Sequence, residues 1–171
     1  MSTSDELLEA NAEYARTFDR GDLPIPPARK LAIVTCMDAR IDPARAFGLQ
    51  EGDAHVIRNA GGRAQDALRS LVISQRLLGT NEIAVIHHTG CGMLTFTNPD
   101  LHAKVKKDLG ADSSSMDFLP FKDLEESIRE DVAFLASSPL IPGDVTIRGF
   151  LYDVRTGRLS EVEVEAAAQR R

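Results

Sequence analysis

The chain has 171 residues, enough for one domain with a hydrophobic core of its own. Hydrophobic residues make up 43% and charged residues 27%, and the formal net charge of −6 argues against nucleic acids and anionic membranes as partners. No apolar run approaches the about 20 residues of a membrane span, and the N-terminus lacks the basic region of a signal peptide. We therefore expect a cytoplasmic protein whose two cysteines are core residues, metal ligands or reactive thiols.

Residues 1–27 are predicted to form an arm ahead of the main domain. The apolar residues that recur there at helical spacing are Leu7, Leu8, Tyr14 and Phe18. They predict an amphipathic helix that is capped at Ser4 and runs to Phe18. The Pro-rich segment 23–27 predicts an extended connector, because proline cannot continue a helix. Such an arm either lies across a neighbouring subunit or folds onto its own domain.

The main domain, residues 28–165, shows the pattern of an α/β protein. Apolar runs without polar alternation predict strands that are buried on both faces, as in a parallel sheet. Amphipathic stretches between these runs predict helices that connect parallel strands. The predicted strands are residues 31–36, 54–58 and 82–87, and the predicted helices are residues 43–47, 64–78, 99–109 and 123–135.

The C-terminal part of this domain predicts a β-hairpin. Residues 145–154 and 159–164 have the composition of strands, and Thr156-Gly157 between them favours a turn. Residues 166–171 are expected to be a frayed tail. The fold class is therefore a single α/β domain with a central, mostly parallel β-sheet flanked by helices, an N-terminal helical arm and a C-terminal β-hairpin at the sheet edge.

Side chains suited to metal binding follow two of the predicted strands. Cys36 ends the first strand, and His88 and Cys91 follow the third. Because right-handed crossovers bring the carboxyl ends of parallel strands to one edge of a sheet, we expect these side chains to meet. Asp38 and Arg40 follow Cys36 at alternate positions, and in an extended chain they would point in the same direction as its thiol.

Two thiolates and one imidazole are a usual zinc set that leaves the fourth tetrahedral position open. Asp38 either occupies that position or turns away, so that a water binds there and loses a proton more readily. Two thiolates neutralise the formal charge of zinc and weaken it as a Lewis acid, so Asp38, held by Arg40, would help to orient the water. The residues alone leave open ordinary core cysteines, a structural zinc site in a non-enzymatic protein, and a metal-free hydrolase with a Cys/His nucleophile.

Three motifs resemble those of the β-class carbonic anhydrases: Cys36-x-Asp38-x-Arg40, Arg58-Asn59-Ala60-Gly61 and His88-x-x-Cys91-Gly92. The likeness covers residues 31–96 and resumes at 145–159. It implies a zinc-hydroxide enzyme for the reversible hydration of CO2 to bicarbonate, with small molecules and neither nucleic acid nor membrane as partners.

The resemblance also assigns roles to individual residues. It implies one Zn²⁺ per chain held by Cys36, His88 and Cys91, and a catalytic dyad of Asp38 and Arg40. The backbone amide of Gly92 would help to hold substrate. The active unit would be a homodimer or homotetramer in which the N-terminal helices embrace the partner subunit.

A second activity is suggested by the same likeness. The segments His87-His88-Thr89 and Cys91-Gly92-Met93-Leu94 resemble a branch of the family that includes carbonyl sulfide hydrolases, which release H2S and CO2 from COS. Many members of the family carry Asp where this chain has Gly90. CO2 and COS are both linear, nearly apolar molecules attacked at carbon, so the sequence does not separate these two substrates.

Other polar and apolar residues are expected to have ordinary structural roles. His87 should face away from His88 and be packed or hydrogen-bonded, His55 should be satisfied within its strand, and His102 should be exposed on a polar helix. The residues of segment 123–135 predicted to form a solvated helix face are Glu125, Glu126, Glu130 and Asp131, and those predicted on its apolar face are Leu124, Ile128, Val132 and Leu135. The residues equally suited to an apolar pocket and to the core are Phe47, Met93, Leu94 and Phe96.

Overall fold

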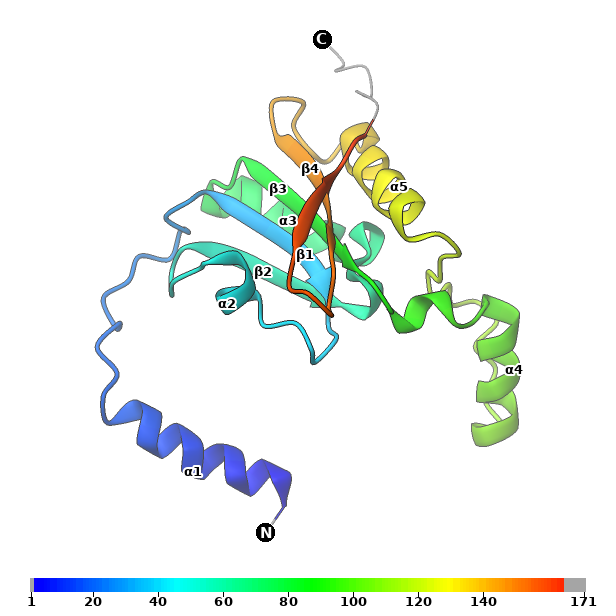
Figure 1. The fold of residues 1–171 in the computed structure, drawn as a ribbon, viewed down its shortest axis with the longest axis horizontal. Helices are drawn as coiled ribbons and strands as arrows, with labels where there is room; N and C mark the ends of the chain where they lie inside the picture. Colours follow the sequence, from blue (N-terminus) through cyan, green and yellow to red (C-terminus); the bar gives the residue numbers. More distant parts are fainter. Residues whose placement is uncertain (1, 165–171) are drawn as a thin grey trace.

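The computed structural model describes residues 2–164, and its centre is a five-stranded sheet in the order β2-β1-β3-β4-β5 (Figure 1). The strands are β1 (Leu31–Cys36), β2 (Ala54–Asn59), β3 (Glu82–His88), β4 (Thr146–Tyr152) and β5 (Leu159–Val162). The first four are parallel, and β5 pairs with β4 in the antiparallel direction. The predicted fold class and terminal hairpin are therefore confirmed. The tail predicted at 166–171 lies outside the described residues.

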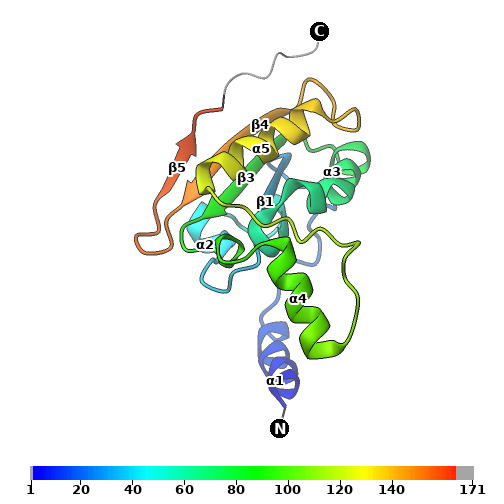
Figure 2. The same ribbon diagram turned by 90° about the vertical axis from the view of Figure 1, so that its right-hand side faces the viewer.

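One helix precedes the first strand, and the others lie between parallel strands. The helices are α1 (Thr3–Ala15), α2 (Pro43–Phe47), α3 (Ala64–Leu78), α4 (Asn98–Leu109) and α5 (Leu124–Ser137), with short 3₁₀ turns η1 (Ala60–Gly62) and η2 (Gly92–Leu94). Helices α3 and α5 pack side by side against the sheet (Figure 2). Among residues 2–164, no helix has the length and apolar character that a membrane span requires.

Burial of β1 and β3 explains why their sequences lack polar alternation. Ala32 and Val34 of β1 pack into the core formed with α3 and α5, whereas Ile33 between them packs into a second core. This second core contains both cysteines and the apolar side chains of Ile41 and Met93. The sheet is therefore covered on both faces, and Cys36 lies at its carboxyl edge inside the second core.

The predicted N-terminal helix exists, but it begins and ends earlier than predicted. Ser2, not Ser4, is the cap, because Ser2 Oγ accepts the N–H of Asp5 while the Asp5 carboxylate accepts the N–H of Ser2. The helix ends at Ala15 rather than at Phe18, and none of its residues is buried. Figures 1 and 2 both show α1 standing away from the sheet.

Candidate metal centre

The three predicted ligand residues meet at the carboxyl ends of β1 and β3. Cys36 is the last residue of β1, His88 is the last residue of β3, and Cys91 immediately precedes η2. One potential ligand atom from each, two sulfurs and a ring nitrogen, lie within 4.8 Å of one another, and all three residues are buried. The parallel topology therefore joins residues more than fifty positions apart in the sequence.

The backbone orients the His88 ring for metal binding. His88 Nδ1 lies 3.0 Å from the carbonyl oxygen of Thr89, which can only accept, so Nδ1 carries the hydrogen. Nε2 therefore presents a lone pair, and this buried atom has no hydrogen-bond partner among residues 2–164. A buried polar atom without a partner costs free energy, and a cation between Nε2 and the two sulfurs would remove that cost. Two cysteines and one histidine fit Zn²⁺.

The two sulfurs change each other's affinity for a proton. The pKa of Cys36 is lowered to about 4, chiefly because the Cys91 side chain hydrogen-bonds its sulfur, with further contributions from His88 and the N–H groups of Asp38 and Gly61. The shared hydrogen bond and burial raise the pKa of Cys91. The cluster therefore stabilises a thiolate at Cys36, which is the form that binds metal ions.

Arg40 holds the Asp38 carboxylate beside this cluster. Arg40 Nε donates to Asp38 Oδ1 at 2.9 Å and Arg40 Nη2 donates to Oδ2 at 2.7 Å, a two-point contact between guanidinium and carboxylate. These hydrogen bonds hold the pKa of the Asp38 carboxyl well below its usual range. Asp38 Oδ2 also lies 3.7 Å from His88 Nε2. The carboxylate is thus paired with Arg40 and adjacent to the ligand atoms.

The chain does not stay extended from Cys36 to Arg40, so the side-chain alternation considered for this segment does not apply. Strand β1 ends at Cys36, and the chain then turns, with the N–H of Ile41 donating to the carbonyl of Asp38 at 3.1 Å. Asp38 Oδ1 accepts the N–H of Arg40 at 2.9 Å, a local contact typical of aspartate in turns. A turn, rather than side-chain alternation, therefore brings Asp38 and Arg40 together.

Arg58 supports the cluster through the backbone, a contribution that we did not predict. Its Nε donates to the carbonyl of Cys36 at 2.9 Å, and its Nη2 donates to the carbonyl of Asp38 at 2.7 Å. The sequence signal was the Arg58-Asn59-Ala60-Gly61 motif, but the role of the guanidinium depends on the pairing of β2 with β1.

Of the other three histidines, His87 and His55 have the structural roles that we predicted, and His102 does not. His87 is fully buried and hydrogen-bonded, as predicted, and His55 lies 2.7 Å from the Ser74 hydroxyl through Nδ1. The prediction that His102 is solvent-exposed is wrong, since the residue is half-buried and its Nδ1 lies 3.0 Å from the Ser113 hydroxyl. Met93, which the sequence suits equally to an apolar pocket and to the core, is buried in the second core, where it contributes to packing.

The predicted solvated acidic face of α5 is wrong for one residue. Glu125, Glu126 and Glu130 are accessible, but Asp131 is fully buried. The physical reason is pairing, because Asp131 Oδ1 lies 3.2 Å from Arg63 Nη2 and Asp131 Oδ2 lies 3.3 Å from His87 Nε2.

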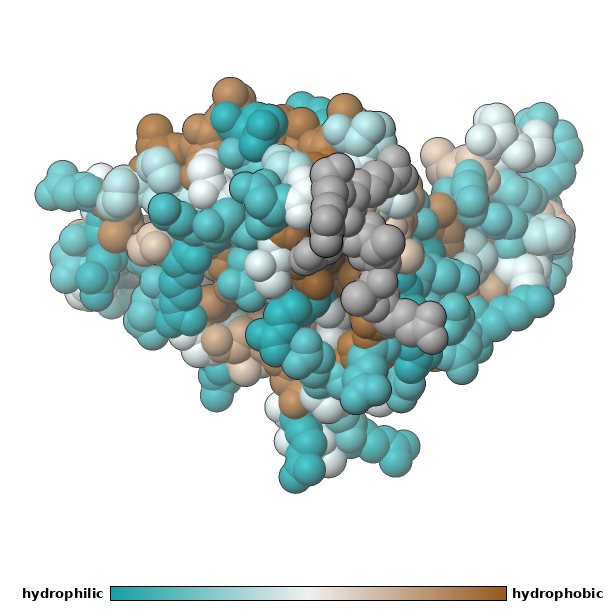
Figure 3. Space-filling model, turned by 90° about the horizontal axis from the view of Figure 1, so that it is seen from above, coloured by the Kyte–Doolittle hydropathy of each residue, from teal (hydrophilic) through white to brown (hydrophobic). Residues whose placement is uncertain are grey.

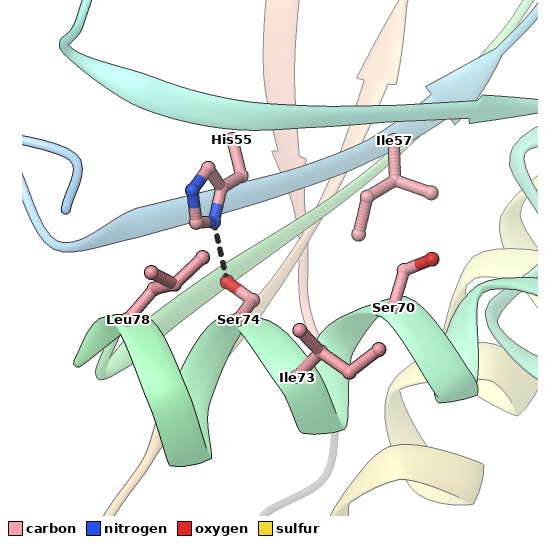
Figure 4. Close-up of a pocket in the computed structure, with 6 residues that line it drawn as sticks. All are labelled: His55, Ile57, Ser70, Ile73, Ser74 and Leu78. Atoms are coloured by element: carbon pink, nitrogen blue, oxygen red, sulfur yellow. Dashed lines mark hydrogen bonds between the residues drawn. The ribbon is translucent and has the colours of Figure 1, made fainter. Parts of the chain in front are cut away.

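An open pocket of about 220 Å³ lies between β2 and α3 (Figure 4). Its lining residues are His55, Ile57, Ser70, Ile73, Ser74 and Leu78. It shares no residue with the cysteine–histidine cluster, and its histidine is engaged with Ser74. The cluster, not this pocket, holds the metal-ligating chemistry.

Comparisons with known proteins identify relatives that match most of the chain. The family described as carbonic anhydrase matches residues 31–159. β-Carbonic anhydrase 1 of Mycobacterium tuberculosis is 46% identical over 164 residues, covering 95% of this chain and 99% of its own. The crystal structure of a carbonic anhydrase from Streptococcus mutans superposes with a TM-score of 0.91 at 53% identity, covering 95% and 99% of the two chains. A carbon disulfide hydrolase of Acidianus is 37% identical, covering 91% of this chain and 86% of its own.

Proposed function

Because the chain belongs to the carbonic anhydrase family, in its β class, we propose that it catalyses the reversible hydration of CO2 to bicarbonate with one Zn²⁺ held by Cys36, His88 and Cys91. The observation that carries this proposal is the convergence of three buried ligand atoms within 4.8 Å at the carboxyl edge of the sheet. A zinc ion bound there would supply a Lewis acid that lowers the pKa of water.

Asp38 is proposed to orient the reacting water. Its pKa is held well below the usual range by Arg40, so the carboxylate stays ionised and can only accept hydrogen bonds near neutral pH. Such a weak base does not retain the proton that the water loses, and this proton must pass on to solvent or buffer. Asp38 therefore directs the water, and Arg40 fixes the direction in which Asp38 points.

The surroundings of the cluster suit a small apolar substrate. The second core, which contains both cysteines, brings the apolar side chains of Ile41, Met93 and Phe121 to this side of the sheet. We further propose that the backbone amide of Gly92, the first residue of η2 directly after Cys91, helps to hold substrate. An apolar environment admits CO2 and strengthens the electrostatic effect of the nearby Asp38–Arg40 pair.

The test combines metal analysis with kinetics. Purified protein should contain about one zinc per chain, and it should accelerate CO2 hydration in a stopped-flow assay with a pH indicator. Removal of zinc with a chelator should abolish this activity, and added zinc should restore it. Full activity in metal-free protein would refute the proposal, and stoichiometric zinc without turnover of any substrate would favour a structural metal site.

A second candidate activity is hydrolysis of the sulfur analogues of CO2. The notable observation is that relatives named carbon disulfide hydrolase are 34–37% identical over most of this chain. COS and CS2 are linear and attacked at carbon, as CO2 is, so the same site would serve all three. Release of H2S from COS or CS2, measured beside CO2 hydration on one sample, ranks the substrates by kcat/KM.

We also propose that the active unit is a homodimer or homotetramer in the cytoplasm. Helix α1 leaves Leu7 and Leu8 67% and 73% exposed, a large apolar area for a helix that buries nothing on its own domain. The main domain also exposes Leu77 of α3, and hydrophobic side chains gather at one margin of the face shown in Figure 3. A reducing compartment is consistent with two free cysteines that must stay reduced, without a disulfide, to bind zinc.

A further inference from the structure

A buried cluster of charged and polar side chains lies next to the proposed metal centre, and the proposed function gives it no role. Its members are Arg63, His87, Ser127 and Asp131, all of which are buried. Side chains alternate along β3, so His87 faces α5 while its neighbour His88 faces the ligand cysteines. Burial of charged groups is costly unless they are paired, and here they are paired across three separate elements.

Asp131 of α5 contacts the start of α3. Its Oδ2 accepts the N–H of Ala64 at 2.8 Å, and its Oδ1 lies 3.2 Å from Arg63 Nη2. Arg63 is the N-cap residue of α3 and provides no side-chain cap of its own. Asp131 therefore replaces the missing cap from another helix, and its negative charge suits the positive end of the α3 dipole.

His87 extends this network to the turn that precedes α3. Its Nε2 lies 3.2 Å from the carbonyl of Gly62 and 3.3 Å from Asp131 Oδ2, so it carries a hydrogen toward these two acceptors. Its Nδ1 lies 2.7 Å from the Ser127 hydroxyl. Serine, histidine and aspartate here resemble a nucleophilic triad, but His87 and Asp131 are fully buried and Ser127 is 1% exposed, which excludes substrate.

The same turn packs directly on Cys36. A Cβ added to Gly62 would lie 2.8 Å from the carbonyl carbon of Thr35 and 3.0 Å from the nitrogen of Cys36. The backbone amide of the preceding residue, Gly61, contributes to lowering the pKa of Cys36. The Asn59 side chain spans this turn, because its Oδ1 accepts the N–H of Arg63 at 2.7 Å. A movement of this turn therefore moves a hydrogen-bond donor relative to a proposed metal ligand.

We propose that Asp131 is a positioning residue for the metal centre: through His87 and the N-terminus of α3 it holds the Gly61–Gly62 turn against Cys36. The proposal rests on the proposed function, because it takes Cys36 as a metal ligand. A hydrogen bond to a thiolate fixes its direction and tunes the electron density that it donates. Loosening the turn should therefore change metal affinity and the metal–sulfur bond, in addition to any loss of stability.

The experiment compares the full-length parent with Asp131→Asn, Ser127→Ala and the control Glu130→Gln. Glu130 is the neighbour of Asp131 on α5, and its carboxylate lies 3.7 Å from Arg63 but is 56% exposed. Folding is monitored by circular dichroism and urea unfolding. Zinc affinity is measured by competition with a chromophoric chelator, the thiolate-to-metal absorption band is recorded with Co²⁺, and kcat and KM for CO2 are measured across pH.

We expect Asp131→Asn to bind zinc about tenfold or more weakly than the parent, as for other residues that support metal ligands. Its cobalt absorption band should shift, and kcat should fall with little change in KM. Ser127→Ala should change the same quantities in the same direction by less, because it removes the contact to His87 Nδ1 and a local hydrogen bond to the carbonyl of Leu124 within α5 but leaves Asp131 in place. Glu130→Gln should keep zinc affinity within about twofold of the parent.

An Asp131→Asn protein that is less stable but retains the parental zinc affinity and cobalt spectrum would overturn the inference, because the residue would then serve the fold alone. If Asp131→Asn does not fold, the same two measurements on Ser127→Ala decide in the same way. A parent that binds neither metal would refute the proposed metal centre and the inference with it. A parent that binds both metals while the folded variants match it would refute the inference alone.

Discussion

At the residue scale, the site combines one pair of thiols, one oriented imidazole and one restrained carboxylate. The restraint on Asp38 comes from Arg40, whose Nη2 also donates to the carbonyl of Gly90 at 3.0 Å. Arg40 therefore bridges the segment that follows Cys36 and the segment between the two proposed ligands His88 and Cys91. A Cβ added to Gly90 would lie 3.8 Å from Arg40 Nη1, an ordinary contact distance, so a side chain would not clash there. Gly90 has a φ of +62°, however, a backbone conformation that favours glycine and strains most other residues.

The first prediction concerns the ligand set. Cys36→Ser, His88→Ala and Cys91→Ser should each lose zinc and activity together, because two remaining ligands bind zinc much more weakly than three. Metal content of the purified variants and CO2 hydration check this. Met37→Ser is the control, since Met37 is adjacent to Cys36 but 65% exposed. A ligand variant with parental zinc content and activity would remove that residue from the site.

The second prediction concerns the Asp38–Arg40 pair in catalysis. Arg40→Ala should keep its zinc and lose about a hundredfold in kcat, because Asp38 is no longer held away from the metal position. Asp38→Ala should also keep zinc while orienting water poorly. Asp38 is ionised throughout the neutral range, so any rise of activity with pH reports deprotonation of water rather than of Asp38. An Arg40→Ala enzyme with the parental pH–rate profile would show that the pair only packs.

The third prediction concerns the same pair and the stability of the fold. The folded-state pKa of Asp38 is lowered, so the pair stabilises the protein above the unfolded-state pKa of about 3.9 and loses this contribution as the pH falls through the folded-state value. The difference in free energy of unfolding between parent and Arg40→Ala should be constant above pH of about 5 and shrink below about 4. Urea unfolding of metal-free protein over this pH range measures it. A difference that does not change with acid would contradict the pairing.

At the element scale, the strand ends and the turns that follow them build the site. Strand β1 ends at Cys36 and strand β3 ends at His88, and both are followed by non-helical segments that hold their backbone against neighbours. The η1 turn after β2 supplies close contact from Gly62, and the turn after β3 supplies the carbonyl of Thr89 to orient His88. Backbone contacts therefore set most of the geometry of the proposed ligands. The sequence motifs show only where these residues lie along the chain.

The fourth prediction tests the close contact at Gly62. Gly62→Ala should destabilise the protein and weaken zinc binding, because the new Cβ would overlap the backbone of Thr35 and Cys36. Gly110→Ala is a matched control, since both glycines have a φ of +69° but a Cβ at Gly110 would meet nothing within 4 Å. Left-handed strain alone costs about 1–2 kcal/mol, and overpacking at Gly62 should add about 1–3 kcal/mol. Equal costs for the two variants in urea unfolding would show that the turn adjusts freely.

The elements themselves were largely predictable from sequence, whereas contacts between distant segments were not. Uninterrupted apolar runs predicted β1 and β3 because burial on both faces demands them. Asp131 was misassigned, although it falls between Ile128 and Leu135 at helical spacing and hence on the buried stripe of α5. A buried aspartate is rare without a partner, and its partner Arg63 is too distant in the sequence for local patterns to reveal it.

The candidate site shows the same division. The types and spacing of Cys36, His88 and Cys91 predicted a shared cluster, because parallel strands end at one edge. The turn that joins Asp38 to Arg40 was missed, since side-chain alternation applies only while the chain stays extended. The contacts of Arg58 with the carbonyls of Cys36 and Asp38 follow from the register of β2 on β1, which no local pattern encodes.

At the scale of the whole molecule, the α/β domain carries an N-terminal helix, α1, that contributes no buried residue to the core. The Pro-rich connector, residues 23–27, leads to Ala28, whose N–H donates to the carbonyl of Gly52 at 2.9 Å. Helix α1 is tethered by Tyr14, whose hydroxyl donates to Glu51 at 2.7 Å, yet none of its residues is buried. An amphipathic helix gains most of its stability by burying its apolar side. A second copy of this chain is the partner that we propose for that side.

The fifth prediction tests this arm. A chain that begins at Ala28 should form a smaller oligomer and be less stable than the parent. It lacks the apolar side chains that we expect to be buried against a partner subunit. Leu7→Ser/Leu8→Ser should show the same change with the arm still present, whereas Glu9→Gln on the same helix should leave the assembly unchanged. Size-exclusion chromatography with light scattering gives the mass, and unfolding at several protein concentrations shows whether stability depends on association. If the shortened chain and the double leucine variant both keep the parental mass and stability, α1 contributes nothing to the assembly, and the active unit must be held together by the main domain alone.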